Sequence, residues 1–180
     1  EVTHTEHGLK IFENFCFTIC GAKDRFPAEN IARIKIRNLQ GKIDDRRVLL
    51  ALSGGSDSST VAYLLGAALK DEPCRIRAIY IRGIDRPDDE AHVIRYFGNQ
   101  DWIELKIVDA TDAFLKALTG KIKAREKRLA MRGVYKDVLE REAKEYGASF
   151  IAQGTLYTDI SESGGGYSSG ARKAVIKLHH

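Results

Sequence analysis

Short apolar runs alternate with longer amphipathic segments from residue 48 to residue 152. The run 48–52, Val-Leu-Leu-Ala-Leu, lies between the charged pair Arg46-Arg47 and two glycines, which is typical of a buried strand. The next segment is rich in alanine and leucine and predicts a helix. The same reading along the chain predicts strands over 48–52, 76–81, 103–108 and 149–152, and helices over 58–69, 89–97, 112–118 and 124–146.

This alternation predicts an α/β fold with a doubly wound parallel sheet of about five strands and helices on both faces. The segment 174–178 is the candidate for the last strand. Ligands of such sheets bind beyond the carboxyl ends of the strands. The polar residues Ser53, Arg82, Asp109 and Gln153 all fall at those ends, so we expect the functional site there.

Two helices are predicted before the first strand. Apolar residues in 9–19 recur at nearly helical spacing, which indicates an amphipathic helix. Pro27 is well placed as the first residue of a second helix, since proline lacks only an amide that has no partner there. We expect Ile31, Ile34 and Leu39 to face inward from this second helix.

Composition narrows the class of protein. The chain has 180 residues, of which 43% are hydrophobic and 30% charged, enough for one globular core. A net charge of +4 suits an anionic small ligand and does not call for nucleic acid, and no apolar run is long enough to span a membrane. Three cysteines form no disulfide framework, so we expect a reduced, cytoplasmic protein. Because the chain starts at Glu1 and stops just after a strand-like run, we expect a piece of a longer polypeptide.

The turn between the first predicted strand and helix reads Ser53-Gly54-Gly55-Ser56-Asp57-Ser58-Ser59. A strand-to-helix turn exposes the first amides of the helix, which have no partner within it and lie at the positive end of its dipole. Glycines let a bulky anion approach the backbone, and serine hydroxyls add donors. The turn therefore predicts a phosphate-binding loop. A plain glycine turn with a serine N-cap is the alternative.

The acid in this turn indicates which kind of phosphate loop it is. The turn has neither the lysine of G-x-x-x-x-G-K-[ST] nor the pattern G-x-G-x-x-G, so the two commonest phosphate motifs are excluded. Asp57 would repel a phosphate unless a cation lay between them. Mg²⁺ is the cation usually held by one or two carboxylates together with phosphate oxygens, so Asp57 predicts a magnesium-dependent site.

The turn resembles the PP-loop of the N-type ATP pyrophosphatases, which cleave ATP between the α and β phosphates. Further motifs resemble the ATP pyrophosphatase half of the GMP synthetase family and extend the likeness over nearly the whole chain. These motifs are Ala113 to Gly120, the pair Lys127-Arg128, the run Gln153-Gly154-Thr155-Leu156-Tyr157-Thr158-Asp159, the pair Glu162-Ser163, and Val175-Ile176-Lys177-Leu178-His179-His180.

The resemblance implies an adenine nucleotide α-hydrolase-like fold and a ligase activity with ATP and Mg²⁺. In that family, xanthosine monophosphate is adenylated with release of pyrophosphate, and ammonia then displaces AMP to give GMP. It also implies ammonia from an upstream glutamine amidotransferase domain and a homodimer in the full-length form.

The matching positions imply a set of site residues. By resemblance, ATP is bound by Ser53, Gly54, Gly55, Ser56, Asp57, Ser58, Ser59, Ile81, Gln153 and Gly154. The catalytic positions are Asp57, which also binds Mg²⁺, Lys127, Arg128 and Lys177. The vicinity of the substrate or the metal holds Asp159, Glu162 and His179. Lys127 and Arg128 belong to a basic stretch, 121–132, that suggests a lid over ATP, although a solvated helix face is the alternative.

The first residues, Glu1-Val2-Thr3-His4-Thr5, resemble the end of a class I glutamine amidotransferase, with Glu1 as the remnant of its catalytic triad. We therefore expect residues 1–22 to be the end of that domain with a linker helix, and 23–180 to be the ATP pyrophosphatase domain. The family's C-terminal dimerisation domain has no counterpart in these 180 residues.

Two departures from the family pattern leave other functions open. Arg82 stands where the family has an acid, and Lys123-Ala124-Arg125 replaces the lid sequence D-P-E. A PP-loop enzyme that adenylates another acceptor is one alternative, and an ATP-binding module without turnover is another. The sequence shows no cysteine pair positioned for sulfur relay and no strongly basic stretch interleaved with aromatic residues, which argues against tRNA as the acceptor.

Overall fold

The computed structural model of the chain describes residues 5–23, 28–70, 72 and 74–155. The chain forms two compact units, Glu1–Lys35 and Ile36–His180. The parallel sheet and the helices that cover it belong to the second unit, which carries the candidate site.

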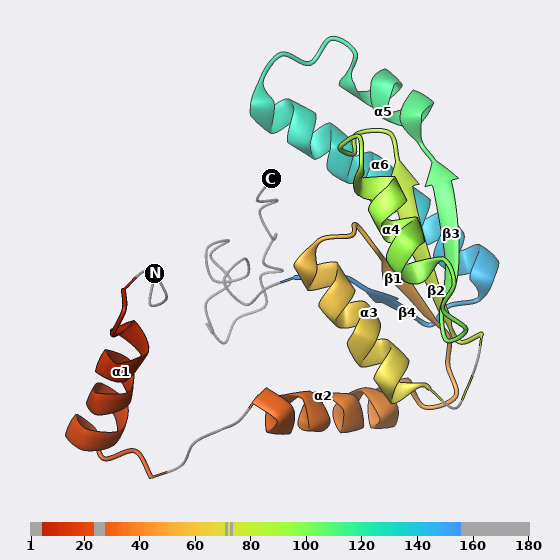
Figure 1. The fold of residues 1–180 in the computed structure, drawn as a ribbon. Helices are drawn as coiled ribbons and strands as arrows, with labels where there is room; N and C mark the ends of the chain where they lie inside the picture. The colour runs from red at the N-terminus through yellow and green to blue at the C-terminus, as the bar shows by residue number, and fades with distance from the viewer. Residues whose placement is uncertain (1–4, 24–27, 71, 73, 156–180) are drawn as a thin grey trace, which may run out of the picture. The chain divides into compact units, whose positions relative to one another are not determined.

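Among the described residues, four parallel strands form the sheet in the order β3-β2-β1-β4 (Figure 1). They are β1 (Val48–Ala51), β2 (Ile76–Arg82), β3 (Glu104–Asp109) and β4 (Phe150–Ala152). Each lies within one residue of its predicted position, and the predicted α/β class with a doubly wound parallel sheet is confirmed. The candidate last strand, 174–178, lies outside the described residues.

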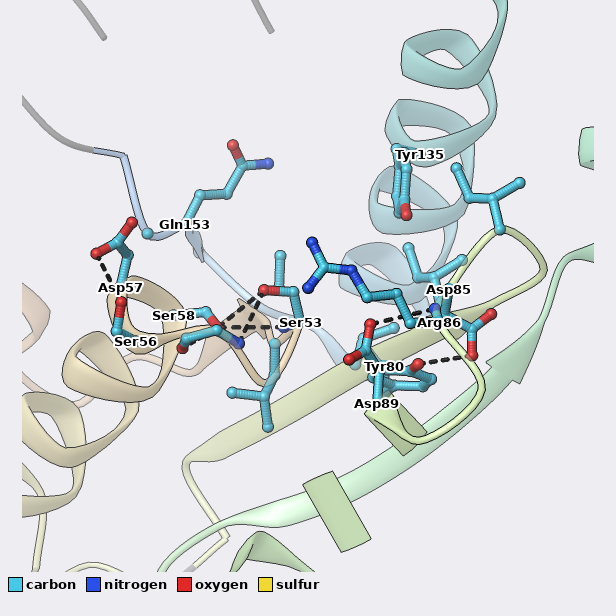
Figure 2. Close-up of a pocket in the computed structure, with 17 residues that line it drawn as sticks. Ser53, Ser56, Asp57, Ser58, Tyr80, Asp85, Arg86, Asp89, Tyr135 and Gln153 are labelled. Carbon is cyan, nitrogen blue, oxygen red and sulfur yellow. Dashed lines mark hydrogen bonds between the residues drawn. The ribbon is translucent and has the colours of Figure 1, made fainter. Parts of the chain in front are cut away.

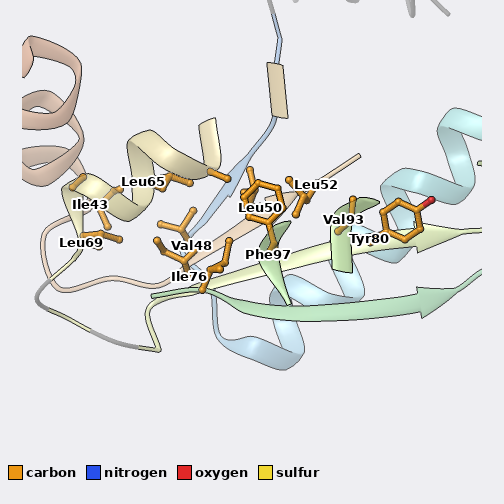
Figure 3. Packing of buried hydrophobic residues seen from close by; sticks show 14 residues of the cluster. Ile43, Val48, Leu50, Leu52, Leu65, Leu69, Ile76, Tyr80, Val93 and Phe97 are labelled. Carbon is orange, nitrogen blue, oxygen red and sulfur yellow. The ribbon is translucent and has the colours of Figure 1, made fainter. Parts of the chain in front are cut away.

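Helices cover both faces of this sheet because alternate strand residues point to opposite sides. Leu50 and Tyr80 pack in one apolar cluster with α3 (Ser56–Ala68) and α4 (Asp89–Phe97), as Figure 3 shows. Leu49 and Ile79 pack in a second cluster with α5 (Thr111–Leu118) and α6 (Ala124–Tyr146). The central strands β1 and β2 are largely apolar because both of their faces are buried.

The strand order reverses beside β1. From β1 the chain passes through α3, β2 and α4 to β3, and α6 then returns it to β4 on the other side of β1. The carboxyl ends of β1 and β4 therefore flank a switch point, where open α/β sheets bind their ligands.

Helix boundaries agree with the sequence for α4 and α6, whereas α3 begins at Ser56, two residues before its predicted start. The earlier start draws Ser56 and Asp57 into the first turn of the helix.

The N-terminal segment is helical, with one difference from the expected single helix. α1 (Gly8–Glu13) continues directly into η2 (Asn14–Ile19), whose backbone is a π-helix. α2 (Ala28–Ile43) follows, and Leu39 packs on the first apolar cluster as predicted. The inward orientation predicted for Ile31 and Ile34 is wrong, since these side chains are 44% and 46% exposed. Both precede Ile36, where the second unit begins.

Across the described residues, no helix combines the length and the apolar character that crossing a membrane requires.

Candidate active site

A cavity of about 580 Å³ opens at the carboxyl ends of β1, β2 and β4 (Figure 2). This volume falls in the usual range for small-molecule sites. The side of the cavity formed by β1, α3 and β4 holds Ala51, Leu52, Ser53, Gly55, Ser56, Asp57, Ser58, Gln153 and Gly154. The side formed by β2, the loop after it, the start of α4 and α6 holds Ile79, Tyr80, Ile81, Ile84, Asp85, Arg86, Asp89 and Tyr135.

The predicted phosphate loop joins β1 to α3 and borders the cavity. Gly54 has a φ of +78°, and a Cβ there would lie 2.9 Å from the Cγ2 atom of Val93, so both the conformation and the space require glycine. Gly55 is the N-cap of α3 and no side chain caps the helix, so the predicted alternative of a serine N-cap is wrong. The first amides of α3 are left for a ligand, at the positive end of the helix dipole.

The serines of the loop hold its shape. Ser58 is 5% exposed, and its Oγ accepts a hydrogen bond from the Ser53 amide at 3.2 Å and donates to the Gly55 carbonyl at 3.2 Å. The Ser53 and Ser58 hydroxyls also share a hydrogen bond of 3.1 Å. Ser59 donates its amide to the Gly55 carbonyl and is not among the residues that line the cavity. The buried hydroxyl of Ser58 therefore rigidifies the cradle from within.

Asp57 brings a carboxylate to the same side of the cavity. It lies in the first turn of α3, is exposed, and accepts a hydrogen bond of 3.4 Å from the Ser56 hydroxyl. Within the described part of the chain, no group of three or more His, Cys, Asp or Glu side chains is arranged to hold a metal ion. A single carboxylate beside a phosphate cradle fits Mg²⁺, because phosphate oxygens and water supply the remaining ligands of that ion.

The chain just after β4 packs closely against the start of α3. Gly154 follows the strand, and a Cβ on it would lie 2.6 Å from the Ser58 amide nitrogen and 2.7 Å from the Asp57 carbonyl carbon. Gln153 lies beside it and lines the cavity (Figure 2). The structure thus brings the predicted residues Gln153 and Gly154 together with the phosphate loop, although a hundred residues separate them in the sequence.

The loop after β2 forms the opposite wall and was not assigned a role from the sequence. Asp85 accepts hydrogen bonds from the Gly83 amide at 2.8 Å and from the Tyr80 hydroxyl at 2.7 Å, and these hold the pKa of its carboxyl below the ordinary value. Burial and the bond to Asp85 raise the pKa of Tyr80. Asp89 accepts a hydrogen bond of 3.2 Å from the Arg86 amide.

Tyr135 reaches the cavity from α6. Its ring packs edge-on against Phe114 with centroids 5.1 Å apart, and burial, followed by the charge of Asp85, raises the pKa of its hydroxyl. No spacing in the sequence sets this tyrosine apart from the core positions of α6, so only the folded chain identifies it as a cavity residue.

Arg82 and Asp109 lie at the carboxyl ends of β2 and β3 as expected, but neither lines the cavity. The Arg82 guanidinium makes a two-pronged pair with Glu90, with both N–O distances 2.6 Å, and reaches Asp109 at 3.4 Å. Hydrogen bonds from Thr111 lower the pKa of Asp109, and the bond from Arg82 lowers that of Glu90. The arginine that replaces the family's acid is thus held by two carboxylates.

The remaining predicted residues are not brought to the cavity by the described structure. Lys127 and Arg128 are exposed on α6, after a loop in which Gly120 has a φ of +74°, and neither lines the cavity. The other predicted positions, Glu1, Asp159, Glu162, Lys177 and His179, lie outside the described residues.

A glycine-lined turn without a lysine, at the switch point of a parallel sheet, defines a class: an α/β phosphate-binding protein of the PP-loop type. Comparisons with known proteins agree with this class. The family model described as NAD synthase matches residues 31–139. Because this match covers more than half of the chain, the chain belongs to the NAD synthase family.

Curated relatives align with the whole chain. It is 38% identical over 182 residues to a glutamine-hydrolysing GMP synthase of Vibrio campbellii and 36% identical to that of Bacillus mycoides. These alignments cover all of the chain and 34% of each relative, so the chain spans about a third of the length of the curated relatives that it matches. They confirm the resemblance to GMP synthetases noted from the motifs.

A solved structure supports the fold. The NH3-dependent NAD synthetase from Campylobacter jejuni, in complex with the nitrate ion, superposes with a TM-score of 0.61 over 79% of this chain and 62% of that chain. The identity is 23%, so the likeness concerns the fold alone.

Proposed function

We propose that this chain is the ATP-cleaving part of a glutamine-hydrolysing GMP synthase. In this proposal it transfers the adenylyl group of ATP to xanthosine monophosphate, and ammonia then displaces AMP to give GMP. The observation that carries the proposal is the glycine-lined turn before α3, which borders a nucleotide-sized cavity in a chain 36–38% identical to GMP synthases.

The two sides of the cavity suit the two ends of ATP. The amides of Ser56 and Asp57 lie in the first turn of α3 and would bind the pyrophosphate end, with Ser53, Gly54, Gly55, Ser58 and Ser59 supplying the shape and further donors. Ile79, Ile81 and Ile84 give an apolar wall for the adenine, and Gln153 and Gly154 border the loop from the other side.

Asp57 would hold Mg²⁺ against the phosphates. Two unit charges 4 Å apart interact by about 4 kcal/mol at an effective dielectric constant near 20, so closely held phosphates repel substantially. The ion, when bound, neutralises this charge and polarises the phosphate oxygens. The first amides of α3 act in the same sense, because they are already oriented where negative charge develops.

Residues away from the described cavity complete the proposal. Lys127 and Arg128 would act from a lid formed by the start of α6, and Lys177 would contact a phosphate. Asp159, Glu162 and His179 would lie near the substrate or the metal. Residues 1–22 would be the end of an amidotransferase domain that contains the triad residue Glu1 and supplies ammonia, and 23–180 the ATP pyrophosphatase domain. The full-length protein would be a homodimer.

A different acceptor is the competing function, because the family model that matches is described as NAD synthase. Synthesis of NAD from ammonia requires amidation of the carboxylate of nicotinic acid adenine dinucleotide. The test is pyrophosphate release from ATP, Mg²⁺ and ammonium with each acceptor in turn. We expect release with xanthosine monophosphate and not with the dinucleotide. Release with the dinucleotide alone would replace the proposed function, and ATP binding without release would indicate a module without turnover.

Replacing Asp57 tests the proposed metal role. Asp57→Asn keeps the side-chain size and removes the charge, so Mg²⁺-dependent pyrophosphate release should fall about 100-fold or more. The melting temperature should stay close to that of the wild type, because Asp57 is exposed. Asp101→Asn is the matched control, an exposed aspartate that is not among the cavity residues. Activity of Asp57→Asn within a few-fold of the control would contradict the metal role.

A further inference from the structure

We propose that Arg86 binds the α-phosphate of the nucleotide and is a catalytic residue of this site. The inference rests on the proposed cleavage of ATP and assigns a residue for which the sequence motifs implied no role. Arg86 belongs to the loop between β2 and α4 and lines the cavity.

The guanidinium of Arg86 is available for a ligand. In Figure 2 its side chain extends from the loop after β2 toward Ser53 and the phosphate loop. Among the described residues, no hydrogen bond or ion pair occupies this guanidinium. The hydrogen bonds of Arg86 are made by its backbone, whose amide donates to the Asp89 carboxylate and whose carbonyl accepts from the Asp89 amide. Arg82, four residues earlier, is instead paired with Glu90 and Asp109.

The loop fixes the backbone from which Arg86 extends. Asp85, one residue before it, is anchored by the Gly83 amide and the Tyr80 hydroxyl. The Arg86 amide donates to Asp89, the first residue of α4. Pro87 follows and restricts Arg86 to an extended backbone. The main chain is therefore ordered before a ligand arrives, and such preorganisation reduces the entropy cost of binding.

The charges around the cavity also indicate that Arg86 binds an anionic group of the ligand. It is the one cation among the described residues that line the cavity, which also include the carboxylates of Asp57, Asp85 and Asp89. Three carboxylates would repel a triphosphate, and Mg²⁺ at Asp57 would compensate only the side formed by the phosphate loop. A guanidinium presents a planar fork of donors that matches two phosphate oxygens.

The position along the cavity selects the α-phosphate. Arg86 follows Ile84, which lies on the wall proposed for adenine, and its side chain extends toward the loop proposed for the pyrophosphate end. The phosphate between these two parts of ATP is the α-phosphate, and Arg86 is placed to contact it. In the transfer, an acceptor oxygen forms a bond to the α-phosphorus while the bond from that phosphorus to the bridging oxygen breaks. Pyrophosphate leaves with the electron pair. Arg86 takes no proton and stabilises the negative charge on the α-phosphate oxygens.

The test measures equilibrium binding of adenosine, AMP, ATP and xanthosine monophosphate to the whole chain and to Arg86→Gln. Loss of one charge-assisted contact should lower the affinity for AMP and ATP by about 10- to 100-fold and leave the affinity for adenosine within about two-fold of the wild type. Arg86→Lys keeps the charge but loses the fork, so its affinities should be intermediate. Arg95→Gln is the matched control, an exposed arginine on α4 that is not among the cavity residues and should bind all four ligands as the wild type does.

Each outcome bears on the inference. Equal AMP affinity of Arg86→Gln and the wild type overturns it, as does a parallel loss for adenosine, which would indicate a structural role. Weaker binding of xanthosine monophosphate with unchanged binding of AMP would place Arg86 at the acceptor site and would also overturn the inference. If the wild type binds ATP but releases no pyrophosphate with xanthosine monophosphate, the proposed function fails while the binding result still decides the role of Arg86. Absence of ATP binding by the wild type overturns both.

Discussion

At the scale of single residues, the cavity depends on the absence of a side chain at Gly154. The backbone of β4 continues past Ala152 and meets the start of α3 so closely that even a methyl group would overlap the Ser58 amide. The same contact leaves Gly154 and Gln153 on the cavity wall beside the phosphate loop. One glycine therefore couples the last strand of the described sheet to the predicted phosphate cradle.

Gly154→Ala tests this contact. The added Cβ would lie 2.6 Å from a backbone atom, which cannot move as a flexible side chain would. We expect a destabilisation of about 1–3 kcal/mol, measured by urea unfolding, together with weaker ATP binding. Gly133→Ala is the control, because a Cβ there has no neighbour within 4 Å and alanine favours the helix. Equal stability of the two variants would contradict the proposed contact.

At the scale of elements, an ion pair ties α6 to β3. Lys106 projects from the middle of β3, and its Nζ lies 2.6 Å from Glu142, which is 3% exposed, and 3.0 Å from Glu145. Arg141 also reaches Glu142 at 3.1 Å. Burial would raise the pKa of Glu142, but the hydrogen bonds from Lys106 and Arg141 outweigh it and lower that pKa. Because α6 also carries Tyr135, which lines the cavity, the ion pair of Lys106 and Glu142 helps to position one wall of the cavity.

Lys106→Met should destabilise the protein by about 1–3 kcal/mol at pH 7, since it removes a partner of a buried carboxylate. The lowered pKa of Glu142 stabilises the wild type above the ordinary carboxyl pKa, and that contribution is lost as the pH falls through the lowered value. The deficit of the variant should therefore shrink below about pH 4. The measurement is the free energy of unfolding as a function of pH.

The exposed pair of Lys136 and Glu140, 3.5 Å apart on α6, provides the control. Lys136→Met removes the same charge where water screens it, so the free energy of unfolding should change by less than about 1 kcal/mol. An equal loss in both variants, or a Lys106→Met deficit that does not depend on pH, would indicate that the pair with Glu142 has no special role.

At the scale of the whole molecule, the proposed ligand should stabilise the fold because its site joins distant segments. β1 with the start of α3, the loop after β2, α6 and the end of β4 all contribute to one cavity. A nucleotide that binds only the folded chain stabilises it by about 2.7 kcal/mol at roughly 100 times its dissociation constant. That corresponds to a rise in melting temperature of about 5–10 °C for a chain of this size.

The rise should require Mg²⁺ if Asp57 holds that ion against the phosphates. Thermal unfolding with ATP, with and without Mg²⁺, measures this, and adenosine at the same concentration serves as the control that lacks phosphates. A melting temperature unaffected by ATP and Mg²⁺ would mean that the cavity does not take the nucleotide.

Much of the fold could be predicted because strands buried on both faces are written as short apolar runs. The runs at β1 to β4, and the breaks between them, located each strand to within one residue. The inward orientation expected for Ile31 and Ile34 was wrong because periodicity shows which residues share a helix face but not whether a partner covers it. Likewise, motif matching indicated the residues of the phosphate loop but not that the Ser58 hydroxyl is buried within it.

The alternation of strands and helices, the glycine-lined turn and the resemblance to GMP synthetases could all be read from the amino-acid sequence alone. These are local patterns, and each can be read within a few consecutive residues. The folded structure was needed to tell which of two nearby arginines lines the cavity, because Arg82 and Arg86 differ in the carboxylates that the fold brings to their side chains. It also brought Tyr135 to the cavity and Gly154 to the phosphate loop. Contacts between segments so far apart follow from strand order and helix packing, which a local pattern does not contain.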